Sequence, residues 1–276
     1  MRDPRYSQSL FLVSLLMAAV YFPQYFARAA DTSLRGVDLH GGLVVQIGAA
    51  ETAEAAAMSR SGRFLIHLLD PDVKIIDKAQ VALRKDGCYG MAFAEVLRDP
   101  AHLPYAENVV NAVVMRSPST LSLVEIHRVI TPLGHFVAEA GVDERLTKEA
   151  LEVVGFEQIT VRADGSLTAR KPWPTGMDAW SHPRHGADGN PVSHDTTVGP
   201  PERVRWIAAA LEEVEGLVTE AGRNFYGGIL ARDSFNGLRL WDNDLEKGTL
   251  NNADFRLPRL NYTSARPVAS AKYVFA

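Results

Sequence analysis

Gly48, Asp70 and Asp99 each follow a short apolar run of the sequence, as residues at the ends of buried strands do. A glycine lets the backbone approach a ligand closely, and a carboxylate accepts hydrogen bonds from hydroxyl and amino groups. An acid after a second strand can accept from two ribose hydroxyls, and an acid after a third strand can meet an adenine amino group. The three residues therefore predict a nucleoside-binding edge. No residue is marked as catalytic.

The elements that would position these residues alternate between strand and helix. Buried strands are predicted at 43–47, 64–69, 91–96, 111–115 and 135–138, and helices at 49–60, 73–85 and 121–130. This spacing is typical of βαβ units, which form a parallel sheet with helices on both faces. Segments 156–162 and 166–170 alternate around Asp164-Gly165, a hairpin signal. We therefore expect an α/β fold, a doubly wound sheet that ends in an antiparallel hairpin.

Three stretches of this region resemble the type 11 group of SAM-dependent methyltransferases. They are Leu43–Gly48, Asp99–Asn108 and Glu125–Gly134, and the last resembles the family's E-x-x-R-V-L-x-P-G-G turn. The resemblance implies a Rossmann-like class I methyltransferase domain over residues 36–171. It further implies a small-molecule ligand, S-adenosylmethionine, held by Gly48, Asp70 and Asp99, and methyl transfer to an unknown acceptor.

The cofactor loop departs from the family pattern of an acid followed by alternating glycines. The same frame holds Gln46, Gly48, Ala50 and Thr52, so only one of the four positions keeps its expected residue. Later in the chain, Asn111 stands where an Asp is usual, and Leu133 replaces a turn glycine. These departures weaken the prediction of catalysis more than the prediction of the fold.

Both acids also have a structural interpretation. Asp70 precedes a proline and could cap the next helix, and Asp99 precedes a proline and could shape a turn. Two functions therefore stay open. The domain is either an active SAM-dependent methyltransferase or a catalytically inactive binding or scaffold module.

The first 29 residues have the pattern of a secretory signal peptide. Arg2 and Arg5 precede the apolar run Leu10–Phe22, and Ala27-Arg28-Ala29 offers a cleavage site. An uncleaved signal anchor is the alternative, but the run is short for a membrane span. We expect an exported, periplasmic protein without a membrane span after cleavage. Export separates the domain from cytoplasmic SAM, which favours the inactive interpretation.

Composition excludes several further classes. The formal net charge is −4, and no basic run accompanies aromatic residues, so a nucleic-acid partner is disfavoured. Cys88 is the only cysteine, which rules out an intrachain disulfide. No feature fixes an oligomeric state.

Residues 172–203 have the texture of a loop-rich linker, with turn signals at Asp188-Gly189 and Gly199-Pro200. Its histidines, His182, His185 and His194, are irregularly spaced, so polar turn residues are predicted and no metal site.

Residues 204–276 form a second region. Gly228–Trp241 resembles the PQQ-like (quinoprotein) β-propeller repeat, and the order of the two regions resembles exported two-domain proteins of planctomycete-type bacteria. A propeller needs several blades, so the resemblance implies a truncated propeller, one incomplete blade without a complete PQQ site. An independent small β module is the alternative.

Overall fold

The computed structural model describes residues 34, 36–200, 204–207, 217–226, 230–242, 267–270 and 273–275. The predicted signal peptide, residues 1–29, lies outside the described residues. None of the helices in the described part is long and apolar enough to cross a membrane.

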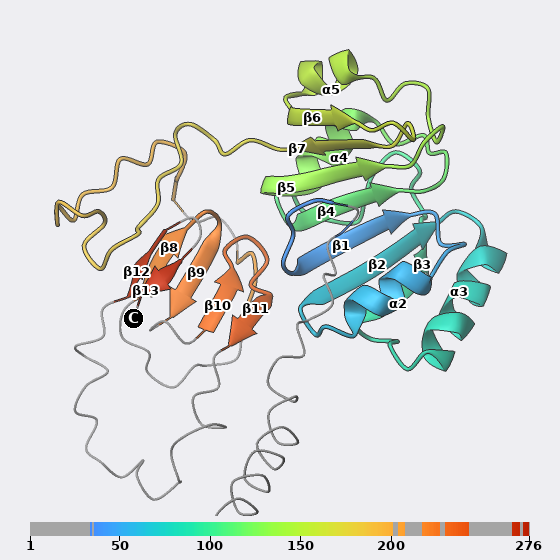
Figure 1. Cartoon of the computed structure of the whole chain (residues 1–276), viewed down its shortest axis with the longest axis horizontal. Coiled ribbons are helices and arrows are strands. Elements are labelled where there is room, and N and C mark those ends of the chain that lie inside the picture. The colour runs from blue at the N-terminus through green and yellow to red at the C-terminus, as the bar shows by residue number, and fades with distance from the viewer. Residues whose placement is uncertain are drawn as a thin grey trace, which may run out of the picture.

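A seven-stranded sheet forms the first unit (Figure 1). Its strands are β1 (Gly42–Ile47), β2 (Phe64–Asp70), β3 (Ala92–Val96), β4 (Val110–Met115), β5 (Ile130–Ala138), β6 (Glu157–Val161) and β7 (Leu167–Arg170). They lie in the order β3-β2-β1-β4-β5-β7-β6. The first five are parallel, whereas β7 is antiparallel to both β5 and β6. The predicted parallel sheet and its terminal hairpin are confirmed.

Helices cover both faces of this sheet, because its central strands are apolar on both sides. Residues of α2 (Ala53–Ser59) and α3 (Val73–Lys85) pack with Val44 of β1 in one core. Residues of α4 (Leu123–Val129) and α5 (Lys148–Val154) pack with Val45 of β1 in the other.

The predicted elements differ from the structure in three places. Helix α2 begins at Ala53 instead of residue 49, because the Gln46 side chain bonds to carbonyls of the preceding loop and holds it out of the helix. Strand β5 begins at Ile130 and takes in the predicted turn through an irregularity in its pairing with β4. Helix α5 has no counterpart in the prediction, although Thr147 caps its start and Gly155 ends it with a φ of 102°.

A separate antiparallel sheet forms the second unit. It contains β8 (Leu217–Glu220), β9 (Arg223–Tyr226), β10 (Leu230–Asp233) and β11 (Arg239–Asp242), paired in chain order. The turn at Asn236-Gly237 joins β10 and β11 into an antiparallel hairpin. The strands β12 (Val268–Ala269) and β13 (Val274–Phe275) form a short antiparallel pair.

The second sheet lies beside the amino ends of the parallel strands, and their carboxyl ends point away from it (Figure 1). Asn111 at the start of β4 donates to Asp233 Oδ2 over 2.6 Å. Asn236 donates from Nδ2 to the Val109 carbonyl and to Asn111 Oδ1, each over 2.8 Å. Asn111 and Asp233 are both buried. The β10–β11 turn is therefore joined to the first sheet by buried polar contacts.

Candidate functional site

The site predicted from sequence lies at the carboxyl edge, where β1 and β4 are neighbours. From β1 the chain proceeds to β2 and β3 on one side, and from β4 to β5 on the other. Such a topological switch point is where open α/β sheets hold their ligands. The residues that follow the strands here decide whether a nucleoside could enter.

Asp70 is the last residue of β2, and its side chain is fully engaged by the backbone. It is 4% exposed. Its Oδ2 accepts from the Ala49 amide at 3.1 Å, and its Oδ1 accepts from the Asp72 amide at 2.9 Å. Asp72, not Asp70, caps α3, by accepting from the Lys74 amide. Asp70 therefore fastens the loop after β1 to the start of α3.

Gly48 has the backbone conformation that the prediction requires, with a φ of +97°. The space beside it, however, is already filled. A Cβ at this position would lie 2.6 Å from Ser117 Oγ, in the segment that follows β4. The room that a glycine leaves for a ligand is taken by the Ser117 hydroxyl, so the two loops touch across the switch point.

Gln46 holds the loop after β1 in place, at the position where the family pattern has an acid. Its side chain is buried, and Nε2 donates to the carbonyls of Gly48 and Glu51 at 2.8 and 2.9 Å. A carboxylate has no proton to offer these carbonyls. The Gln46 amide thus fixes an extended loop where the sequence predicted helix.

Arg116, directly after β4, crosses the same edge. Its Nη1 donates to Glu139 Oε1 at 2.8 Å, and its Nη2 pairs with Glu54 Oε2 in the first turn of α2. The Arg116 side chain is only 10% exposed. This pair of ion pairs joins the elements after β1, β4 and β5. Together with the Gly48–Ser117 contact, it leaves the residues present a poor fit for S-adenosylmethionine.

Asp99 lies on the surface. Its side chain is 60% exposed. Oδ1 accepts from the Ala101 amide at 2.9 Å, and Oδ2 lies 3.2 Å from His102 Nδ1. The Ala101 amide, first among several causes, lowers the pKa of Asp99. These contacts are those of a turn-shaping residue, and contact with a cofactor stays a prediction.

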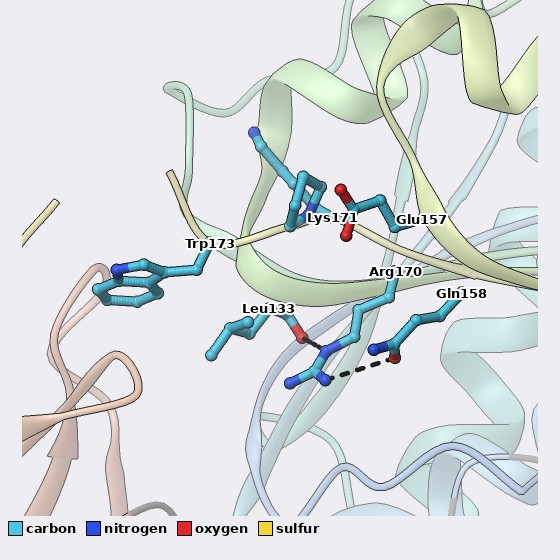
Figure 2. A pocket seen from close by; sticks show the side chains of 7 residues that line it. Leu133, Glu157, Gln158, Arg170, Lys171 and Trp173 are labelled. Atoms are coloured by element: carbon cyan, nitrogen blue, oxygen red, sulfur yellow. Dashed lines mark hydrogen bonds between the residues drawn. The ribbon is translucent and has the colours of Figure 1, made fainter. Parts of the chain in front are cut away.

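The structure also has a small cavity, at the opposite end of the first sheet (Figure 2). Leu133, Arg170 and Trp173 are among its lining residues, and Arg170 Nε donates to the Leu133 carbonyl at 3.2 Å. Its volume of about 70 Å³ is far below the several hundred Å³ of a ligand pocket. Leu133, which replaces a glycine of the resembling turn, keeps a left-handed φ of 63°.

Lys171, beside this cavity, has a structural role. Its Nζ donates to Asn108 Oδ1 and to the carbonyls of His127 and Ile130, at 2.7 to 2.8 Å. Burial lowers the pKa of Lys171 to about 8. All three N–H donors of the ammonium group are engaged, so the amine is not free for chemistry.

The linker brings together three groups that the sequence spacing did not single out. Ligand atoms of Asp178, His185 and His194 all lie within 4.8 Å of one another. His182, the third histidine of the segment, is not in this group and contacts Ser181 instead.

In the sequence Arg116 follows the predicted strand 111–115, but nothing there singles out Glu54 or Glu139 as its partners. The Arg116 partners lie 62 and 23 residues away along the chain. No pattern in the local sequence predicts these two ion pairs.

Comparison with known proteins finds no matching protein-family profile. No curated protein matches either. Among solved structures, the chain is similar to the [4+2]-cyclase SpnF, with 17% identity, a TM-score of 0.41 and coverage of 49% of this chain and 76% of that one. It is also similar to a SAM-dependent methyltransferase from Aquifex aeolicus, with 17% identity, a TM-score of 0.37 and coverage of 47% and 81%. A third is phosphoethanolamine N-methyltransferase 2 of Haemonchus contortus, with 14% identity, a TM-score of 0.42 and coverage of 50% of each chain.

The sheet, with five parallel strands followed by the antiparallel hairpin of β6 and β7, agrees with the predicted doubly wound sheet that ends in a hairpin. The first unit therefore has a Rossmann-like fold, with a mixed seven-stranded sheet.

Proposed function

We propose that the methyltransferase-fold domain is a non-catalytic module whose cofactor edge is closed by its own side chains. The observation that carries the proposal is the Arg116 bridge to Glu54 and Glu139 across the switch point. A nucleoside that entered between β1 and β4 would have to separate partly buried ion pairs. Separating such pairs leaves uncompensated charge, which costs several kcal/mol.

Titration of the full-length chain with S-adenosylmethionine and with S-adenosylhomocysteine tests this proposal. We expect no heat of binding at ligand concentrations up to about 1 mM, where a Kd of that order corresponds to only about 4 kcal/mol. Micromolar binding that is lost in Asp70→Asn would overturn it. Arg116→Gln is the matched variant. It removes both ion pairs, so any affinity for these two ligands that the bridge suppresses should appear in this variant.

Methyl transfer is the second candidate, favoured by the fold itself and by Asp70 at the end of β2. An active chain would be a SAM-dependent methyltransferase acting on an unknown acceptor. It would have to bind the cofactor through Gly48, Asp70 and Asp99, and the Arg116 bridge would have to open. Binding in the wild type, weakened by variants at all three positions, would establish this candidate.

We also infer that the second sheet is one blade of a PQQ-like propeller, in an exported chain that carries a signal peptide. Four antiparallel strands paired in chain order support this, since blades have that arrangement. Methyltransferase-like domain, linker and blade would then occupy residues 36–171, 172–203 and 204–276. Amino-terminal sequencing of the protein after expression in a Gram-negative host tests the export: cleavage after Ala29 supports it, and an intact Met1 contradicts it.

A further inference from the structure

The linker is held against the second sheet by backbone hydrogen bonds. The Trp180 carbonyl accepts from the Thr219 amide of β8 at 2.8 Å, and the Ser181 carbonyl accepts from the Ala269 amide of β12 at 2.9 Å. Residues 178–194 are therefore a defined loop that can fix side chains in place.

Asp178 is the centre of a polar cluster in this loop. Its Oδ2 accepts from the His194 backbone amide at 2.7 Å and lies 2.8 Å from His185 Nε2. The His194 amide, first among several donors, holds the pKa of Asp178 well below its usual range. Asp178 therefore acts as a hydrogen-bond acceptor between the two histidine residues.

His185 has one ring nitrogen with no partner. Its side chain is only 10% exposed, and its Nδ1 is buried without a hydrogen-bond partner within the described part of the chain. Because the Asp178 carboxylate only accepts, Nε2 of a neutral His185 carries the proton and Nδ1 has a bare lone pair. A buried polar atom left unsatisfied costs about 1–3 kcal/mol.

His194 supplies a second imidazole next to the first. The ring centroids of His185 and His194 are 5.2 Å apart, with an interplanar angle of 64°. His194 is exposed, so its ring can reorient without disturbing a core.

We propose that this loop binds a divalent transition-metal ion through the imidazoles of His185 and His194, with Asp178 as the carboxylate that orients His185. A metal at Nδ1 would satisfy the buried nitrogen, and a carboxylate on the other ring nitrogen is the arrangement that metal-binding histidines adopt. Imidazole ligands select zinc, copper, iron or nickel over magnesium or calcium. Two imidazoles leave coordination positions for water or for a further ligand.

The test is calorimetric titration of the metal-stripped full-length chain with Zn²⁺ alone. We expect one equivalent to bind with a Kd in the micromolar range or tighter. We expect His194→Ala to weaken binding at least 10-fold and Asp178→Asn to weaken it 10- to 100-fold. His182→Ala is the matched control, since it removes a neighbouring imidazole outside the cluster, and its affinity should equal that of the wild type.

His185→Ala removes a buried ring and could fail to fold. His194→Ala removes an exposed ring, so it decides the question if circular dichroism shows it folded. Absence of Zn²⁺ binding to the wild type overturns the proposal, as does a His194→Ala variant that binds like the wild type. A Co²⁺ spectrum that changes in His194→Ala but not in His182→Ala would support it independently.

Discussion

The side-chain amide of Asn111 donates a 2.6 Å hydrogen bond to the carboxylate of Asp233, 122 residues further along the chain. Asn111 stands where the resembling methyltransferases usually have an Asp. Burial, first among its causes, raises the pKa of Asp233, so the site tolerates one carboxylate poorly and a second one less. An Asn at position 111, where the family pattern has an Asp, thus suits the contact with Asp233 of the second sheet.

Asn111→Asp should destabilise the protein by about 3 kcal/mol, the cost of an uncompensated buried charge. Urea unfolding at neutral pH measures this loss. The exchange Asn111→Asp with Asp233→Asn restores one donor and one acceptor, so it should recover most of the stability. A single variant as stable as the wild type, or an exchange no better than the single variant, would contradict the assignment.

Gly48→Ala should destabilise more than Gly62→Ala. Both glycines have positive φ, +97° and +71°, but only the Gly48 Cβ would clash, with Ser117, whereas nothing lies within 4 Å of one at Gly62. Backbone strain costs each variant about 1–3 kcal/mol, and overpacking adds about 1–3 kcal/mol at residue 48 alone. Thermal unfolding of the pair measures the difference. Equal losses would mean that Ser117 does not fill the space beside Gly48.

Gln46→Glu restores the acid of the family motif and should nevertheless destabilise. At neutral pH it would aim a carboxylate at the carbonyls of Gly48 and Glu51, with a cost of about 1–3 kcal/mol. Protonation supplies a donor, so the deficit relative to the wild type should shrink as the pH falls below about 5. Urea midpoints of both proteins at pH 7 and pH 4.5 test this. A deficit independent of pH would point to packing instead of the missing donor.

Acid should destabilise the fold through His67. This histidine is 4% exposed, and burial lowers its pKa from 6.5 to about 4, opposed by the Glu95 carboxylate. Between these values the unfolded chain binds a proton that the folded chain does not, so stability falls as the pH drops through this window. From pH 7 to pH 5 the loss from His67 is on the order of 2 kcal/mol.

His67→Gln should reduce this slope but not remove it, because burial also lowers the pKa of His127 and His135 to about 4. Denaturant unfolding from pH 7 to pH 5 gives both slopes. His40→Gln is the control, because His40 is exposed. Identical slopes for His67→Gln and the wild type would show that His67 titrates normally in the fold.

The sheet could be predicted because its signals are local. Apolar runs, and a hairpin at Asp164-Gly165, specify strands without knowledge of what they contact. Helix α5 was missed because its apolar residues do not form one stripe: Leu151 is buried, but Val153 is 88% exposed. Its capping residues Thr147 and Gly155 are the signal that could have found it.

Whether the carboxyl edge of the sheet is open to a ligand could not be predicted, because residues distant in the sequence decide what occupies it. The positions of Gly48 and Asp70 at strand ends were correct, but what surrounds them depends on Ser117 and on amides of the next loop. Arg116 shows the same limit: it carries a charge at a strand end, but only the fold selects Glu54 and Glu139 as its partners.

The buried contact between Asn111 and Asp233 also orders events during synthesis. The seven-stranded sheet has all its strands once Arg170 has left the ribosome, and amino-terminal units fold first. Within the first unit Asn111 Oδ1 accepts from the Leu43 amide, but Nδ2 gains its protein acceptor only after Asp233 has been synthesised. The polar contacts at the amino end of β4 are therefore completed only when the second sheet docks there.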